Sequence, residues 1–318
     1  MKKVPAIFLA FLLVIGLAAS GGNAAEQRHI GFVVYGAANQ AIIPQMAAVT
    51  NYIEAQGDRY TLLDAAFNFG VMPDLVDQLI VQDVDGIIVM NIFPDIITDA
   101  VKRANEKNIP VVVTDCGFND PDQTLLAGQT TSDNYRAGEL VVEAFVRDHG
   151  PEGNVILLTA LFTIPAEERT RAIYETIAKY PGIKVLADET VDVTVALSLT
   201  AVENLLQVHG GSNIDAIFGI FGNAAIGAIS ASQASGNTHI KIYGIDASMD
   251  ELNIIKAGMQ MGSVAQDFFM LGNSGIIKLY QAMNGESIPE YLTYVPVEYI
   301  DASNVDEYMA KVLEQQQQ

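Results

Sequence analysis

The sequence has little cysteine, no tryptophan and few basic residues. Its single cysteine, Cys116, cannot form a disulfide within the chain, and four scattered histidines lack the spacing of a zinc site. Only 17 lysines and arginines stand against 38 acidic residues, so the formal net charge is −21. Such a chain repels nucleic-acid phosphates and anionic lipids. We therefore expect no nucleic-acid partner, no metal and no cofactor.

The overall composition is typical of a globular protein. The chain has 318 residues, of which 50% are hydrophobic and 17% charged. A chain of this length has room for roughly two domains of about 100 to 200 residues, each with its own apolar core. This composition favours an α/β or α+β protein and excludes a disordered chain.

The N-terminus has the pattern of a secretory signal peptide. Lys2 and Lys3 precede an uncharged, mostly apolar run over residues 4–19, and small residues follow it. We expect cleavage after Ala24, with Ala25 as an alternative. A membrane anchor is the competing interpretation, but the run is shorter than the ~20 residues of a spanning helix. The predicted mature protein, about two units more negative than the precursor, is exported to the periplasm.

From residue 29 onward, short β-branched segments alternate with longer amphipathic ones, as in repeated βα units. Residues 29–35 form an apolar run typical of a strand buried on both faces. Apolar residues from Ile42 to Ile53 then fall on one helical face, and Gly57 is placed to end that helix. Further strands are predicted near residues 59–64, 86–91, 110–115, 153–159, 183–188, 215–221, 240–245 and 262–266. Helices are predicted at residues 132–148, 167–180, 195–208 and 223–235.

Nine or ten strands are too many for one compact core with this number of helices, so the pattern favours two lobes. We place the break near Thr131. No proline- or glycine-rich linker occurs there, which predicts that the chain crosses directly between lobes that move on hinges.

Several segments, in order and spacing, carry a family resemblance. They are HIGFVVYGAANQ, ANEKNIPVVVTD, TSDNYRAG, EERTRAIYETIAKYPGIKV, DAIFGIFGNAAIGAI, IYGIDAS and GSVAQD. Each is weak alone, but together they resemble the type I periplasmic sugar-binding proteins of ABC importers, over residues 28 to about 300.

The resemblance implies two doubly wound parallel-sheet lobes joined by three hinge crossovers. It places an N-terminal lobe at 26–131 plus 267–293 and a C-terminal lobe at 132–266 plus 294–318, after a signal peptide at 1–24. A small hydroxylated ligand would be enclosed between the lobes and delivered to an ABC permease in the membrane. A chemoreceptor is a further partner that the resemblance allows, and we expect a monomer.

Five polar residues match the family pattern at strand ends or in the loops beyond them: Asn39, Asp115, Arg169, Asp246 and Gln266. A buried polyol needs carboxylates to accept, a guanidinium to donate and amides to do both. Each residue also has an ordinary alternative. The three short polar side chains are suited to capping turns, the arginine to a solvated helix start, and the glutamine to a hinge.

The sequence departs from the family where aromatic residues usually stack on the sugar. Ala41 and Ile42 stand after the first strand, and Val193 replaces another common aromatic. Cys116 lies beside the expected carboxylate, and Phe221 replaces an amide. We therefore predict that Ile42, Cys116 and Phe221 also contact the ligand, in a cleft with mainly aliphatic walls.

This pocket would suit a polyol, a deoxysugar, a cyclitol or a small non-sugar metabolite better than ribose. Phe93, Phe118 and Phe162 lie near strand ends, either as a substitute wall or as ordinary core packing.

Other functions stay open at this point. The same fold serves sensors that present their closed state to a receptor. An exported enzyme with Asp115 and Asp246 as acid and base is the third class, but no nucleophile or metal constellation accompanies them, so we predict no catalysis. A repressor related to the lactose repressor is disfavoured, because no helix-turn-helix precedes the domain and the charge has the wrong sign.

Overall fold

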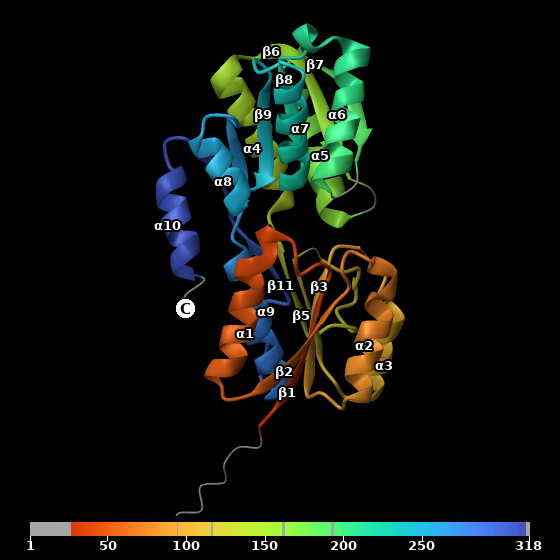
Figure 1. The fold of residues 1–318 in the computed structure, drawn as a ribbon. Helices are drawn as coiled ribbons and strands as arrows, with labels where there is room; N and C mark the ends of the chain where they lie inside the picture. The colour runs from red at the N-terminus through yellow and green to blue at the C-terminus, as the bar shows by residue number, and fades with distance from the viewer. Residues whose placement is uncertain (1–26, 94, 116, 161–162, 192–193, 316–318) are drawn as a thin grey trace, which may run out of the picture.

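The computed structural model describes residues 27–93, 95–115, 117–160, 163–191 and 194–315. Over these ranges the chain forms two α/β lobes, one above the other in Figure 1, and each contains a six-stranded sheet. The predicted fold class, two doubly wound lobes built on parallel sheets, is confirmed. The predicted signal peptide lies outside the described residues.

The first sheet has the strand order β2-β1-β3-β4-β5-β11, and all its neighbouring strands pair in parallel. Its strands are β1 (His29–Val34), β2 (Arg59–Asp64), β3 (Gly86–Asn91), β4 (Val111–Asp115), β5 (Gly128–Ser132) and β11 (Leu292–Val295).

The second sheet has the equivalent order β7-β6-β8-β9-β10-β12, and only β12, at its edge, is antiparallel to its neighbour. Its strands are β6 (Glu152–Thr159), β7 (Gly182–Thr190), β8 (Ala216–Gly219), β9 (Lys241–Asp246), β10 (Gly262–Gln266) and β12 (Val297–Asp301).

Helices cover both faces of each sheet. In the first lobe α1 packs on α9 and α2 on α3; in the second, α4 packs on α5, α6 on α7 and α8 on α10. The helices are α1 (Ile43–Ala55), α2 (Met72–Val81), α3 (Thr98–Glu106), α4 (Asn134–His149), α5 (Ile164–Ile177), α6 (Val195–His209), α7 (Gly222–Ala234), α8 (Met249–Lys256), α9 (Phe268–Met283) and α10 (Val305–Gln315). Short 3-10 turns, η1 (Gln40–Ile42), η2 (Phe69–Val71) and η3 (Gly211–Asn213), complete them.

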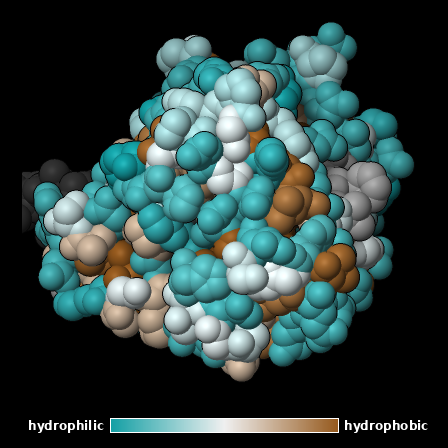
Figure 2. All heavy atoms as spheres, turned by 90° about the horizontal axis from the view of Figure 1, so that it is seen from above, coloured by the Kyte–Doolittle hydropathy of each residue, from teal (hydrophilic) through white to brown (hydrophobic). Residues whose placement is uncertain are grey.

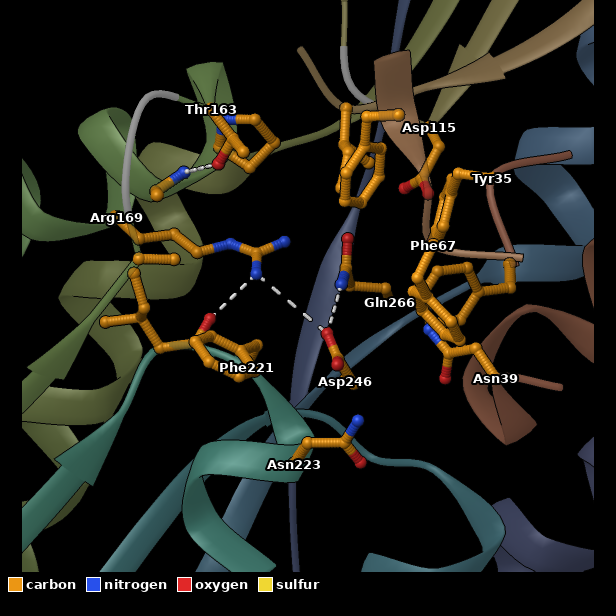
Figure 3. Close-up of a pocket in the computed structure, with 17 residues that line it drawn as sticks. Tyr35, Asn39, Phe67, Asp115, Thr163, Arg169, Phe221, Asn223, Asp246 and Gln266 are labelled. Carbon is orange, nitrogen blue, oxygen red and sulfur yellow. Dashed lines mark hydrogen bonds and ion pairs between the residues drawn. The ribbon is translucent and has the colours of Figure 1, made fainter. Parts of the chain in front are cut away.

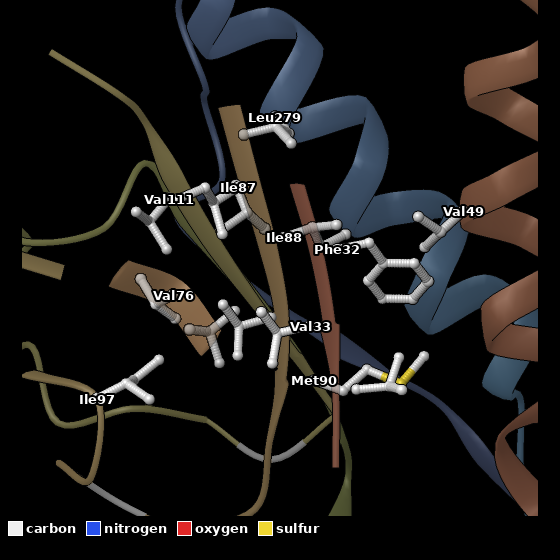
Figure 4. Packing of buried hydrophobic residues seen from close by; sticks show 14 of the residues in the cluster. Phe32, Val33, Val49, Val76, Ile87, Ile88, Met90, Ile97, Val111 and Leu279 are labelled. Carbon is white, nitrogen blue, oxygen red and sulfur yellow. The ribbon is translucent and has the colours of Figure 1, made fainter. Parts of the chain in front are cut away.

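The apolar run of β1 is explained by cover on both faces. All six of its residues are buried. Figure 4 shows Phe32 on the side of α1 and α9, near Val49, and Val76 on the opposite side with Ile97. Alternate side chains along the strand therefore enter separate apolar layers, and neither face has a polar stripe.

The outer face of the second lobe is polar, in contrast to the buried strand β1. Seen from above, it is mostly hydrophilic, and its apolar residues lie in small separate patches (Figure 2). The buried hydrophobic residues of the described chain gather in the cores of the two lobes.

The chain passes between the two sheets three times, each time through one residue: Asp133 after β5, Asp267 after β10 and Pro296 after β11. Asp133 and Asp267 also cap the helices that follow, by accepting hydrogen bonds from the backbone N–H groups of Arg136 and Met270. Three direct crossovers agree with the predicted hinges. The division of the domains by residue number stays a prediction.

The sequence-based list of strands was incomplete, because it lacked β5, β11 and β12. β5 has the polar sequence GQTTS although all five residues are buried. Two of its hydroxyl groups donate inside the lobe: Thr130 Oγ1 to the Leu271 carbonyl at 3.0 Å and Thr131 Oγ1 to the Asp115 carbonyl at 3.1 Å. A strand of this kind has no hydrophobic pattern to reveal it.

Candidate functional site

A cavity of about 100 Å³ lies between the lobes, where the carboxyl ends of strands from both sheets meet. Its lining includes Asp115 at the end of β4, Asp246 at the end of β9 and Gln266 at the end of β10 (Figure 3). This is the position where open parallel sheets bind ligands. The volume is enough for several water molecules or one small solute.

Asp246 is the centre of the polar part of the cavity. Its Oδ1 accepts a hydrogen bond from Gln266 Nε2 at 2.6 Å, and its Oδ2 accepts one from the Gly222 N–H at 2.9 Å. Arg169 Nη1 lies 3.9 Å from Oδ1, as an ion pair. Burial raises the pKa of Asp246, while Arg169 and the two hydrogen bonds oppose that rise. A carboxylate held in this way presents a fixed acceptor to the cavity.

Arg169 is held in place by the second lobe. Thr163 caps the start of α5 by accepting the Ala166 N–H at 3.2 Å, and Arg169 lies in the following turns with 6% of its surface exposed. Its Nη1 donates to the Ile220 carbonyl at 2.8 Å and its Nε to Asn134 Oδ1 at 2.9 Å. The alternative of a solvated helix start is therefore wrong for this residue.

Asn134 joins this arginine to the first crossover. It is 1% exposed, and its Nδ2 donates to Thr131 Oγ1 at 3.3 Å and to the Ser132 carbonyl at 3.1 Å. Thr131 Oγ1 in turn donates to the Asp115 carbonyl at 3.1 Å. A continuous chain of hydrogen bonds thus runs from Arg169 through the crossover to the carboxylate-bearing residue of the first lobe.

The two cavity carboxylates share an unusual backbone. Asp115 has a φ of 82° and Asp246 a φ of 124°, both in the region that non-glycine residues rarely adopt. Each stands at the last position of a parallel strand, one in each lobe. Such conformations persist where the surrounding structure enforces them, and they are common at binding sites.

The first lobe contributes an aromatic wall, which we define as Tyr35, Phe67 and Phe69. The ring centroid of Tyr35 lies 6.3 Å from that of Phe67 and 6.2 Å from that of Phe69. Phe93 packs edge-on against Phe69 at 4.5 Å and supports it without lining the cavity. Phe268, at the start of α9, adds another ring to the lining.

Six of the eight predicted site residues line this one cavity: Asn39, Asp115, Arg169, Phe221, Asp246 and Gln266. Asn39 also caps η1, since its Oδ1 accepts the Ala41 N–H at 3.1 Å, so the capping alternative holds beside the cavity position. Their contact with a ligand stays a prediction.

The prediction for Ile42 is wrong. Its side chain is fully buried in the core of the first lobe, and the expected aliphatic wall is made of aromatic rings instead. The 3-10 turn before α1 directs this side chain inward. Phe118 is core packing, at 5% exposure. Cys116, Phe162 and Val193 lie outside the described residues.

Sequence reasoning missed the aromatic wall and Asn223, which lines the cavity in the first turn of α7. A usable signal was present: Tyr35 directly follows β1, and Phe67 and Phe69 follow the neighbouring β2. Loop residues after adjacent strand ends meet at one edge of a sheet.

Two further searches of the described part of the chain bear on function. No helix there is both long and apolar enough to cross a membrane. No cluster of histidine, cysteine and carboxylate side chains within these residues has the geometry to hold a metal ion.

Two α/β lobes around a cavity with an aromatic and a charged side define a two-lobed ligand-binding protein. The periplasmic binding protein domain family matches residues 30–287, and the chain belongs to this family. The family is one of binding proteins, which agrees with the predicted absence of catalysis.

Similar proteins support the same assignment. The chain is 28% identical to a xylitol-binding protein of Mycolicibacterium smegmatis, over 99% of this chain and 90% of that protein. It is 26% identical to a ribose import binding protein of Haemophilus influenzae, over 91% of this chain and 96% of that protein. Among solved structures, an ABC transporter solute binding protein from Bacillus halodurans with bound myo-inositol has a TM-score of 0.82 at 26% identity, over 90% of this chain and 98% of that one.

Proposed function

We propose that this protein is the solute-binding component of an ABC importer and that it binds a small, neutral, hydroxylated solute by closure of the two lobes. The observation that carries the proposal is the cavity itself, in which the aromatic wall of one lobe faces the Arg169, Asp246 and Gln266 cluster of the other.

The charges favour a neutral ligand. Asp246 and Arg169 form an ion pair at 3.9 Å, and Asp115 adds a second carboxylate, so no further cation among the described lining residues is left to balance an anionic solute. Hydroxyl groups both donate and accept, and the cluster offers a carboxylate, a guanidinium and an amide to meet them. Aromatic rings on the opposite side suit the C–H surface of the same molecule.

The related proteins narrow the class further. One is a xylitol-binding protein, and another was solved with bound myo-inositol. Xylitol is a linear polyol and myo-inositol a cyclic one. We therefore place a polyol or cyclitol before a sugar as the ligand. The predicted partner is an ABC permease, and the protein would act as an exported monomer after cleavage near Ala24.

Calorimetric titration of the refolded protein tests the ligand class, because unfolding removes any solute that co-purifies. Xylitol, myo-inositol and ribose are the probes, and gluconate is the control for charge. We expect binding of at least one polyol and none of gluconate. Absence of heat with every neutral probe, or tighter binding of gluconate, contradicts the proposal.

Deletion of the gene separates transport from sensing. Loss of uptake of the bound solute is the expected result. Loss of chemotaxis toward that solute with intact uptake would instead identify a chemoreceptor as the partner.

A further inference from the structure

Glu251, a second carboxylate, lies behind Asp246 and does not line the cavity. It is the third residue of α8 and is fully buried. Its Oε1 accepts from Gln260 Nε2 at 3.0 Å, and its Oε2 accepts from the Ser248 N–H at 3.1 Å. A capping box would form equally well at the surface, so capping alone does not account for the burial of this charge.

The backbone leaves space for Glu251 against Asp246. A Cβ atom on Gly222 would lie 2.5 Å from Glu251 Oε2 and 3.4 Å from Asp246 Oδ2. Both oxygens therefore approach the same point, and only a glycine fits there. The Gly222 N–H is itself bonded to Asp246. A Cβ on Gly244 would collide with Glu251 Oε1.

One cation, Arg169, stands against three carboxylates: Asp115 and Glu251 are buried, and Asp246 is partly buried. Arg169 is paired with Asp246, and no positive charge from the described residues adjoins Glu251. Of the elements around it, η1, α7 and β10 carry no titratable side chain, and β9 brings Asp246. The other titratable groups of β9, Lys241 and Tyr243, donate to Asp148. The cation of α10, Lys311, pairs with Asp267 at 3.0 Å. Burial and the charge of Asp246 raise the pKa of Glu251 to about 7.

Gln266 connects Asp246 and Glu251 to the cavity. Its Nε2 is bonded to Asp246, and it is 4% exposed. Its Oε1 has no hydrogen-bond partner among the described residues, and Figure 3 shows this oxygen turned away from Asp246 into the cavity. An unpartnered buried acceptor is costly and is satisfied when a hydroxyl donates to it. The charge state of Asp246 thus bears directly on a group that faces the ligand.

We propose that Glu251 is a positioning residue that shares a proton with Asp246, so that ligand affinity falls as this proton is lost. The proposal rests on the proposed function. With Glu251 protonated, Arg169 and Asp246 balance each other, and Asp115 of the first lobe is the one further carboxylate among the described lining residues over which a neutral solute closes. Ionised Glu251 adds a buried negative charge without a counter-ion, and closure removes the water that would screen it.

The same proton decides whether the unfolding free energy rises or falls with pH. A carboxyl group whose pKa is higher in the folded than in the unfolded chain binds the proton more tightly when folded. The folded chain therefore holds more protons between pH 4.5 and about 7. Unfolding free energy contributed by Glu251 is highest below this window and declines as pH rises through it.

The test compares wild type, Glu251→Gln and Glu307→Gln between pH 5 and pH 8. Glu307 is the matched control, an exposed glutamate at the third position of α10. In wild type and the control we expect about three- to tenfold weaker binding of the tightest polyol at pH 8 than at pH 6. In Glu251→Gln the affinity should be nearly independent of pH, because glutamine resembles the protonated acid.

Urea unfolding of the ligand-free proteins gives a second readout. The wild-type curve should fall relative to that of Glu251→Gln as pH rises, while the Glu307→Gln curve stays parallel to wild type. Parallel curves for all three proteins, or an unchanged pH slope of binding in Glu251→Gln, would overturn the proposal. If no polyol binds, the proposed function fails, and the unfolding curves still decide the proton sharing.

A titration of the wild type guards against a variant that does not fold. In protein labelled with ¹³C at the glutamate carboxyls, one resonance should titrate near neutral pH. Titration of every glutamate below about pH 5 is the opposite result.

Discussion

The two sides of the cavity are built by different means. In the first lobe, the rings of the aromatic wall contact one another and are supported by apolar neighbours such as Phe93. In the second lobe, Arg169 and Asp246 are each fixed by hydrogen bonds to backbone groups. Loss of a ring removes packing, whereas loss of a charge leaves its buried partner uncompensated. The polar side should therefore be the less tolerant of substitution.

The largest effect is expected from Arg169→Ala. Removal of the guanidinium takes away the cation paired with Asp246, in front of the buried Glu251, and the ligand loses its charged donor. Affinity for the best polyol should fall more than 100-fold, which is about 3 kcal/mol.

Arg171→Ala is the matched control for this loss. That side chain is exposed on the same helix, with its guanidinium 5.1 Å from the ring centre of Tyr135. It should bind as wild type in the same calorimetric titration. Equal affinities in the two variants would contradict the polar site.

A smaller effect is expected when Phe67 is replaced by leucine. The ring face is lost while a large apolar side chain remains, so affinity should fall about three- to tenfold. Tyr60→Leu, an exposed aromatic on β2, should change nothing. A loss in Phe67→Leu as large as in Arg169→Ala would remove the contrast between the two sides.

The smallest effect should come from Gly36→Ala. A Cβ there would lie 2.7 Å from Phe67 Cζ, so the ring must move. We expect a few-fold weaker binding with little change in melting temperature. In the Phe67→Leu background, Gly36→Ala should weaken ligand binding less than it does in wild type. Additive losses of affinity would show that Gly36 does not act through Phe67.

The fold was largely predictable where apolar pattern and burial agree. β1, β3 and β4 are mostly apolar runs with polar residues only at their ends and every residue buried, and each was predicted within one residue of its bounds. The strands that were missed are polar, as β5 is, or short strands at a sheet edge, as β11 and β12 are. Their pairing depends on contacts with distant parts of the chain, which local pattern does not reveal.

The site was predictable where a polar residue ends a strand. Asp115 and Asp246 have this signal, and the parallel sheets bring it into one cavity. Ile42 was wrong because one turn of 3-10 helix decides whether a side chain faces the cleft or the core. Local sequence pattern could not predict the burial of Glu251 either, because this burial depends on Gly222 and Gly244 in other elements.

The three single-residue crossovers also govern the order in which the protein is able to fold. α9 and β11 complete the first lobe, yet they follow the whole sheet of the second lobe except β12. A growing chain therefore finishes neither core until β11 and β12 have been made, near residue 300. Contacts so distant in sequence predict slow folding, with the edges of β5 and β10 left unpaired until the last strands arrive.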